Sequence, residues 1–187
     1  MRAFRHRAAP TAPGSVPRRP DRGAIDFAWR VHGAQESWSA RADVKASILL
    51  ALEGGGLFAV ISAHAADGSL ALLSGWNRSL GLVGAGLLLL ALVGAAVAVF
   101  PQLGRSRKLR ERYARHTIYF GHLRLWDPAE LSARLTSMSA DEELEALGRQ
   151  LVEMGKQNWS KHRWVQGSLI LAISGVLAVS VSALTAL

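Results

Sequence analysis

The sequence predicts an all-α membrane protein with three transmembrane helices and long cytoplasmic helical extensions. Residues 46–63, 80–100 and 165–187 form three apolar stretches that are long enough to cross a bilayer, which requires about 20 residues of helix. Backbone groups in lipid have no water to bond, so each stretch must be helical. Glu53 is the only charged residue within them.

The basic residues lie on one side of these spans. Of the 22 lysines and arginines, nine precede the first span, twelve lie within residues 101–163, and only Arg78 lies in the loop of residues 64–79. Lys and Arg concentrate on the cytoplasmic side of membranes. We therefore expect a multi-pass protein of the cell membrane, with the N-terminus and residues 101–163 in the cytoplasm and the C-terminus at the outer face.

Composition excludes several function classes. The net charge of +8 is explained first by topology and by anionic lipid head groups, so no nucleic-acid partner is expected. The absence of cysteine removes disulfides, thiolate nucleophiles and sulfur-ligated metals. His116, His122 and His162 form no zinc motif, and the serines of the spans have no paired base. We expect no metal, no cofactor and no enzymatic activity.

The chain divides into a tail and one domain. Residues 1–23 are basic and contain four prolines without an apolar core, a composition typical of a disordered segment and not of a cleaved signal peptide. The domain covers residues 24–187, with a helix that starts near Ala24 and runs into the first span. Pro101 should kink or end the second span.

Two helix starts precede the third span. Asp127, Pro128 and Glu130 have the order of an N-cap, a first helical residue and an acid in the first turn. Ser139 and Glu142 have the spacing of a capping box. Apolar residues then recur at helical spacing into the last span: Leu144, Leu147, Leu151 and Met154. The pattern predicts three long helices, each partly cytoplasmic and partly transmembrane, joined by a short connecting helix.

Small residues recur at intervals of four in all three spans, which allows helices to approach closely in lipid. They are Gly55, Ala59 and Ala63 in the first span, Ala91 and Ala95 beside Gly94 and Ala98 in the second, and Ser174, Ala178, Ser182 and Ala186 in the third. Because three helices enclose little interior of their own, we expect a homo-oligomer.

Glu53 is the most unusual residue of the spans. It lies seven positions into the first span, about 10 Å below the inner boundary, where an ionised acid costs on the order of 2.5–3.5 kcal/mol. Gly54, Gly55 and Gly56 follow it and weaken the helix. The acid is therefore a gating candidate that forms a hinge or lines a polar path. Alternatively, it is protonated and shares a hydrogen bond with a neighbouring span.

A cationic pair marks the start of the first span. Arg41 and Lys45 are four residues apart and share a helix face, while Asp43 points elsewhere. Such a pair suits a phosphate group, and Asp43 could accept a hydrogen bond from a sugar or base. Alternatively, these residues only anchor the helix at the membrane surface, and the same alternative applies to Lys161 at the foot of the third span.

Residues 38–50, with the sequence WSARADVKASILL, resemble the first motif of the Pycsar transmembrane effector family. The block IYFG at residues 118–121 and the run QNWSKHR at residues 157–163 follow in the family's order, and the resemblance covers residues 34–187. It implies a bacterial antiphage system in which a pyrimidine cyclase makes cyclic CMP or cyclic UMP on infection. The nucleotide then switches a membrane effector that damages the inner membrane and arrests the cell.

With that ligand in view, five residues are candidates to bind the nucleotide from the juxtamembrane helices: Arg41, Asp43, Lys45, Asn158 and Lys161. An amide and a cationic group suit a ligand with one phosphate charge, a ribose and a small base. Two other interpretations stay open, a non-catalytic scaffold whose cytoplasmic helices dock a partner and a small channel.

Overall fold

Three long helices dominate the computed structural model, which describes residues 22–65, 74–100, 110 and 113–185. They are α1 (Arg22–His64), α2 (Gly75–Val99) and α6 (Ala140–Leu184). Each contains a segment that is long and apolar enough to cross a membrane, and the described residues contain no strand. The predicted all-α fold with three helices that can span a membrane is confirmed. Of the tail predicted for residues 1–23, only the last two residues are described, and both are already helical.

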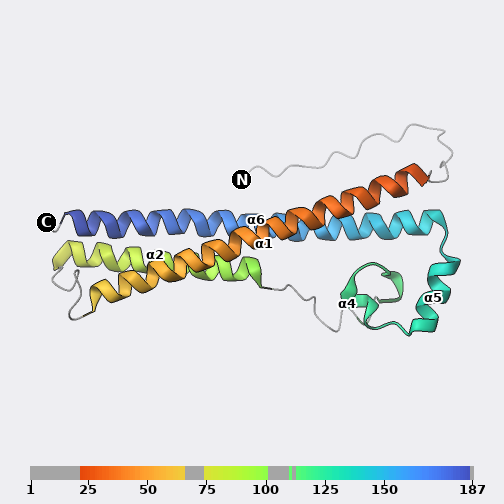
Figure 1. The fold of residues 1–187 in the computed structure, drawn as a ribbon, viewed down its shortest axis with the longest axis horizontal. Helices are drawn as coiled ribbons and strands as arrows, with labels where there is room; N and C mark the ends of the chain where they lie inside the picture. Colours follow the sequence, from red (N-terminus) through yellow and green to blue (C-terminus); the bar gives the residue numbers. More distant parts are fainter. Residues whose placement is uncertain (1–21, 66–73, 101–109, 111–112, 186–187) are drawn as a thin grey trace, which may run out of the picture.

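Helices α1 and α6 run in the same direction, and α2 runs against both (Figure 1). α2 lies along the C-terminal half of α6, while α1 crosses α6 obliquely and ends beside α2. The first residues of α1 therefore lie on the same side of the spans as the segment before α6. This segment contains a short 3₁₀ turn, Tyr113–Arg115, and helices α4 (Phe120–Leu123) and α5 (Pro128–Ser137).

Helix α2 differs from the expectation that all three helices extend beyond their spans. It ends at Val99, and Phe100 already has extended backbone angles, φ −60° and ψ 128°. The residue before a proline is driven out of helical conformation, so Pro101 ends α2 at the end of its span. Only α1 and α6 continue well beyond the membrane-spanning part.

Both long helices are unbroken. α1 runs through Gly33 and through Gly54, Gly55 and Gly56 without interruption, so the glycines do not form a bend. α6 begins with the predicted capping box, in which the Glu142 backbone N–H donates to Ser139 Oγ over 3.3 Å and the Ser139 N–H donates to Glu142 Oε2 over 2.9 Å. It then continues into the last span.

Outside the spans, α1 and α6 are held together by a small apolar core. Ile25 and Ala28 of α1 pack with Leu147 of α6, which is fully buried, and the side chains of Ile118, Leu144 and Leu151 pack against them. The predicted stripe on α6 therefore faces α1. At the end farthest from the spans, Trp29 Nε1 donates a hydrogen bond to Glu143 Oε1 over 3.1 Å.

Inside the spans, α2 and α6 approach through small residues. A Cβ atom placed on Gly84 would lie 2.8 Å from the carbonyl oxygen of Gly175, and one placed on Gly175 would lie 2.8 Å from that of Gly84. Ala91 and Ala95 are fully buried in this contact, which confirms the predicted role of the small residues of α2. In the first span, by contrast, Gly55 and Ala59 are exposed and make no close packing within the described chain.

Candidate functional site

The described polar side chains between the two parallel helices form one line of contacts, which we call the α1–α6 seam. It comprises Gln35, Ser39, Asp43 and Glu53 of α1 with Asn158, Lys161 and Ser168 of α6. Because α1 and α6 run in parallel, residues later in α1 meet residues later in α6, and the seam passes from the extensions into the spans.

Lys161 is the centre of the seam at the foot of the third span. Its Nζ donates to Asp43 Oδ1 over 2.7 Å, to Asp43 Oδ2 over 2.9 Å and to Ser39 Oγ over 3.1 Å. An ammonium group has three donors, and all three have an acceptor here. The Lys161 side chain is 18% exposed and that of Asp43 is 40% exposed, so an anion from solvent can reach the pair, but it must displace the carboxylate.

Asn158 lies one turn before Lys161 and is buried. Its Nδ2 donates to the backbone oxygen of Gln35 over 3.0 Å, and Gln35 Nε2 donates to the backbone oxygen of Leu151 over 3.2 Å. His162 Nδ1 lies 2.8 Å from the Asn158 backbone oxygen. The Asn158 amide thus joins the two extensions in this structure.

The five predicted ligand-binding residues divide into two groups. Asp43, Asn158 and Lys161 lie together in the seam, whereas Arg41 and Lys45 are exposed on another face of α1. Positions 41 and 43 differ by two residues, which turns their side chains roughly 200° apart on a helix. The structure therefore does not gather all five around one pocket.

Glu53 is buried at 4% exposure in the membrane-spanning part of the seam. Ser168 Oγ donates to Glu53 Oε1 over 2.6 Å, which is the hydrogen bond with a neighbouring span that the sequence allowed. Ser168 also packs against α2, because a Cβ placed on Gly94 would lie 3.4 Å from its Cβ. The second carboxyl oxygen, Oε2, is buried, and no described residue offers it a hydrogen bond.

A second polar group lies near the other end of the spans. His64 Nδ1 donates to the Val60 backbone oxygen over 2.9 Å, and Nε2 is buried and has no partner in the part of the chain that the structure describes. A Cβ on Gly81 would lie 2.9 Å from His64 Nε2 and 3.2 Å from Ser182 Oγ. Ser182 itself donates to the Asn77 backbone oxygen over 2.6 Å. His64 and these α2 and α6 groups were not predicted.

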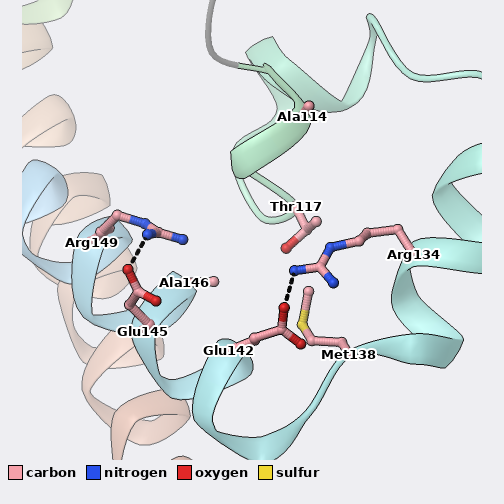
Figure 2. A pocket seen from close by; sticks show the side chains of 8 residues that line it. All are labelled: Ala114, Thr117, Arg134, Met138, Glu142, Glu145, Ala146 and Arg149. Carbon is pink, nitrogen blue, oxygen red and sulfur yellow. Dashed lines mark hydrogen bonds and ion pairs between the residues drawn. The ribbon is translucent and has the colours of Figure 1, made fainter.

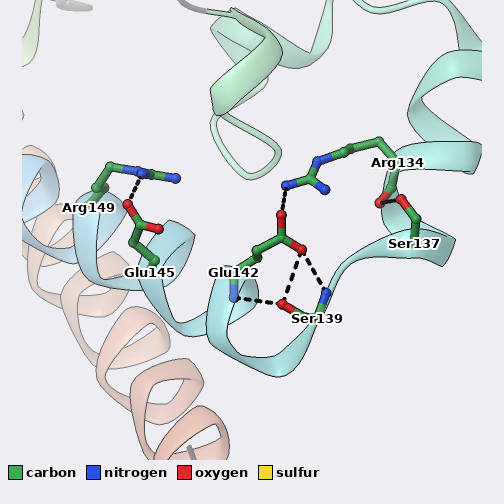
Figure 3. Close-up of polar contacts among 6 residues, drawn as sticks. All are labelled: Arg134, Ser137, Ser139, Glu142, Glu145 and Arg149. Carbon is green, nitrogen blue, oxygen red and sulfur yellow. Dashed lines mark hydrogen bonds and ion pairs between the residues drawn. The ribbon is translucent and has the colours of Figure 1, made fainter. Parts of the chain in front are cut away.

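A small cavity of about 70 Å³ lies between α5, the 3₁₀ turn and the start of α6 (Figure 2). Arg134 of α5 donates to Glu142 of α6 over 2.8 Å, and Arg149 pairs with Glu145 within α6 (Figure 3). The hydrogen bonds from Arg134 and Ser139 lower the pKa of Glu142 to about 2. Both arginines that line this cavity are paired with carboxylates, so we interpret the cavity as part of a structural contact. We call this contact of Arg134 with Glu142 the corner between α5 and α6.

The connecting segment holds a compact aromatic cluster. The rings of His116 and His122 stack with centroids 4.3 Å apart, and Tyr119 meets His122 edge-on at 5.5 Å. Burial and, to a smaller extent, the neighbouring His116 lower the pKa of His122. This cluster carries the predicted block of residues 118–121 and supports Ile118 against the apolar core.

Comparison with known proteins agrees with this architecture. The family model described as the Pycsar effector protein domain matches residues 27–187, which includes α1, α2, the connecting segment and α6. No curated protein and no solved structure gives a significant match. The match covers most of the chain and begins seven residues before the resemblance noted at residues 34–187. The chain therefore belongs to the Pycsar effector family, the non-catalytic transmembrane effectors of cyclic pyrimidine antiphage signalling.

Proposed function

We propose that this chain binds cyclic CMP or cyclic UMP in the cytoplasm and then weakens the barrier of the bacterial inner membrane, which arrests the infected cell. The observation that carries the proposal is the Asp43–Lys161 pair. It joins α1 and α6 where both enter their spans, and both helices are unbroken on either side of it. A change at this pair therefore reaches the membrane through continuous helices.

The ligand's phosphate would compete with the Asp43 carboxylate for Lys161. Both are acceptors of charge-assisted hydrogen bonds, and the pair is open enough to solvent for such an exchange. Ser39 Oγ and the Asn158 amide lie on either side of Lys161 in the seam. Arg41 and Lys45, exposed on α1, would attract the anion to the same level of the membrane surface.

Exchange of partners at Lys161 would change how α1 lies against α6. A ligand shifts a conformational equilibrium only by its differential affinity for the two states. In the described state the Asp43 carboxylate occupies two of the three Lys161 donors, so nucleotide binds more tightly to a state in which α1 has moved away. The moved state is the one that opens the membrane.

Sidedness follows from the distribution of charge. The first residues of α1 and the segment before α6 lie on one side of the bundle. All Lys and Arg residues except Arg78 lie within residues 1–45 and 101–163, which contain these two parts. The positive-inside tendency makes that side cytoplasmic, where a pyrimidine cyclase would release the nucleotide. Exposed small residues on the first span, such as Gly55 and Ala59, favour assembly of several copies in the membrane.

Membrane potential in cells that express the chain tests this function. Supplying cyclic CMP or cyclic UMP should collapse the potential with the wild-type protein. Lys161→Gln should raise the nucleotide concentration for a half-maximal response at least tenfold, and the double variant Arg41→Glu, Lys45→Glu should abolish the response while the protein still inserts. Lys156→Gln is the matched control, because Lys156 lies on the same helix and pairs with Glu153 in an exposed position.

Two outcomes would reject the proposal. A wild-type protein that leaves the potential unchanged with both nucleotides would indicate a scaffold. A reporter fused within residues 113–139 that maps to the periplasm would place the seam on the wrong side for a cytoplasmic ligand. An unchanged response in the Arg41, Lys45 double variant would remove these two residues from the nucleotide site.

A further inference from the structure

We propose that the activated protein conducts protons along the α1–α6 seam, with Glu53 as the proton-binding group inside the membrane. This inference rests on the proposed function, since it names what crosses the membrane and where. Acidic and histidine side chains inside transmembrane segments mark ion pathways and proton relays by default. Glu53 of the seam lies inside the first span, and two further titratable groups of α1 lie at the ends of that span, Asp43 in the seam and His64 beyond it.

The three groups span the membrane in equal steps. At 1.5 Å per residue, successive groups are roughly 15 to 17 Å apart along α1. Each lies beside a polar group of α6: Asp43 contacts Lys161, Glu53 contacts Ser168, and His64 lies near Ser182 across Gly81. Glu53 and His64 are eleven residues apart, which brings them to nearly the same face of the helix. Asp43, ten residues before Glu53, is turned roughly 80° from it, so the three groups share one broad side of α1.

Buried polar atoms at the levels of Glu53 and His64 indicate that these side chains do more than hold the helices together. Glu53 Oε2 and His64 Nε2 are buried with no hydrogen-bond partner among the described residues. Buried polar atoms are nearly always satisfied in folded proteins, and each exception calls for an explanation. A carboxyl oxygen and an imidazole nitrogen that lack protein partners are free to exchange a proton with water that enters the seam.

Gly56 leaves room for such water. It lies one turn beyond Glu53 toward His64 and is half-buried. No atom of the described residues comes within 4 Å of the position that a Cβ would take there. When α1 moves away from α6, water in this space can join the Glu53 carboxyl group to the outer part of the seam. A proton is then taken up on one side of Glu53 and released on the other, and no covalent product forms.

The same contacts argue against a larger permeant. A dehydrated metal cation needs a ring of carbonyl or charged groups to replace its water, whereas the seam offers one carboxyl group and one hydroxyl at the level of Glu53. A proton needs only successive hydrogen-bonding groups. In an energised bacterium it would move from His64 to Glu53 and on to the cytoplasmic boundary at Asp43, which dissipates the proton-motive force.

The full chain in vesicles of phosphatidylethanolamine and phosphatidylglycerol, loaded with a pH-sensitive dye, tests this inference. A potassium gradient with valinomycin supplies the driving voltage, and cyclic CMP or cyclic UMP is added. The wild-type protein should acidify or alkalinise the interior according to the sign of the voltage, without release of a trapped dye of several hundred daltons. Glu53→Gln should lower the evoked proton flux at least tenfold, and Glu53→Asp should restore a measurable part of it.

Serine variants of α6 provide the matched comparison. Ser168→Ala removes the hydroxyl that contacts Glu53, and Ser174→Ala removes an exposed hydroxyl of the same span. The first should lower proton flux severalfold and the second should leave it unchanged. Binding of the nucleotide to each purified variant shows that it is folded.

The outcomes separate the two proposals. Proton flux without dye release that Glu53→Gln removes supports the inference. If nucleotide evokes dye release and Glu53→Gln leaves the proton flux unchanged, this inference alone is overturned. The inference alone is also overturned if Glu53→Gln abolishes dye release and proton flux equally, because Glu53 would then act as a gate. A wild-type protein that binds nucleotide and releases neither protons nor dye overturns the proposed function and this inference with it.

Discussion

Helix α6 contacts its two partners in opposite ways. Against α2 the contact depends on missing side chains, since Gly84 and Gly175 bring the two backbones together. Against α1, within the spans and at their foot, it depends on polar side chains, the Asp43–Lys161 pair and the Glu53–Ser168 hydrogen bond. A backbone contact allows one arrangement only, whereas an ion pair or hydrogen bond can be exchanged for another partner at little net cost. We therefore expect the α2–α6 pair to be the fixed frame and α1 to be the part that moves.

The largest effect on stability is expected where the backbones of α2 and α6 approach most closely. Gly175→Leu places a side chain against the Gly84 backbone oxygen and Leu88, and such overpacking should lower the free energy of unfolding by about 3 kcal/mol. Unfolding in mixed detergent micelles, followed by circular dichroism, measures the change.

Gly86→Leu is its control. Gly86 is exposed on the same α2 helix, with no described atom within 4 Å of the Cβ position, so this variant should unfold like the wild-type protein. Equal stability of the Gly175 and Gly86 variants would show that α2 and α6 do not form a fixed frame.

A smaller effect is expected for the intramembrane bond between α1 and α6. Hydrogen bonds between transmembrane helices are worth roughly 0.6 kcal/mol on average and at most about 1.7. A double-mutant cycle of Glu53→Gln and Ser168→Ala should give a coupling energy in this range, and the corresponding cycle with Ser174→Ala should give none. A coupling energy larger than the loss of unfolding free energy in the Gly175→Leu variant would reverse the assignment of frame and moving part.

The frame was easier to predict than the seam. Apolar length alone gives the three spans, and the capping residues Asp127 and Ser139 give the starts of α5 and α6. The partner of Glu53 could not be predicted, because the third span contains four serines at several helical positions and composition does not distinguish Ser168 from Ser174. Which serine meets the acid depends on how α1 crosses α6, and no local pattern encodes that angle.

The ligand-binding prediction shows the same limit. Helical geometry predicts correctly that Asp43 points away from Arg41 and Lys45, and the structure confirms that separation. The pairing of Asp43 with Lys161 depends on residues 118 positions apart, which only the packed helices bring together. An acid on α1 and a cation on α6 at the same distance from their apolar runs is the signal from which the pair could have been predicted.

High salt should weaken the contact of α6 with α1 and leave its contact with α2 unchanged. The Asp43–Lys161 pair is partly exposed, so 1 M salt, with a Debye length of about 3 Å, should weaken it by less than about 1 kcal/mol. The Gly84–Gly175 contact contains no charge and should not respond. Because the chain has no cysteine, spin labels can be placed at introduced cysteines on Ser37 and Gln157 for the seam and on Ser79 and Ser180 for the frame.

Distances between the labels give the result. Salt should broaden the distribution between positions 37 and 157 and leave that between 79 and 180 unchanged. Lys161→Gln should broaden the first distribution without salt, to an equal or larger extent. A seam distribution that neither change affects would mean that the ion pair does not hold α1 in place.

The smallest effect is expected at the corner between α5 and α6, which supports the far end of the seam. Glu142 joins Arg134 of α5 and caps α6, and the next residue, Glu143, accepts the hydrogen bond of Trp29 on α1. Arg134 and Ser139 hold the pKa of Glu142 at about 2 in the folded protein, below its ordinary value of 4.5. Stabilisation by Glu142 is therefore complete above pH 4.5 and is lost as the pH falls from 4.5 toward 2.

Hydrogen exchange of the first turns of α6 at matched chemical exchange rates measures this loss. Protection there should fall between pH 5 and pH 3. In the Glu142→Gln variant the same turns should be weakly protected at both pH values. Glu145→Gln is the control, because Glu145 pairs with Arg149 of the same helix. If acid also weakens protection along α1 near Trp29, the corner holds α1 at its far end, and the moving part of the molecule is fixed at both ends of its extension. If α1 protection is unchanged, the polar contacts at Asp43 and Asn158 hold α1 without the corner.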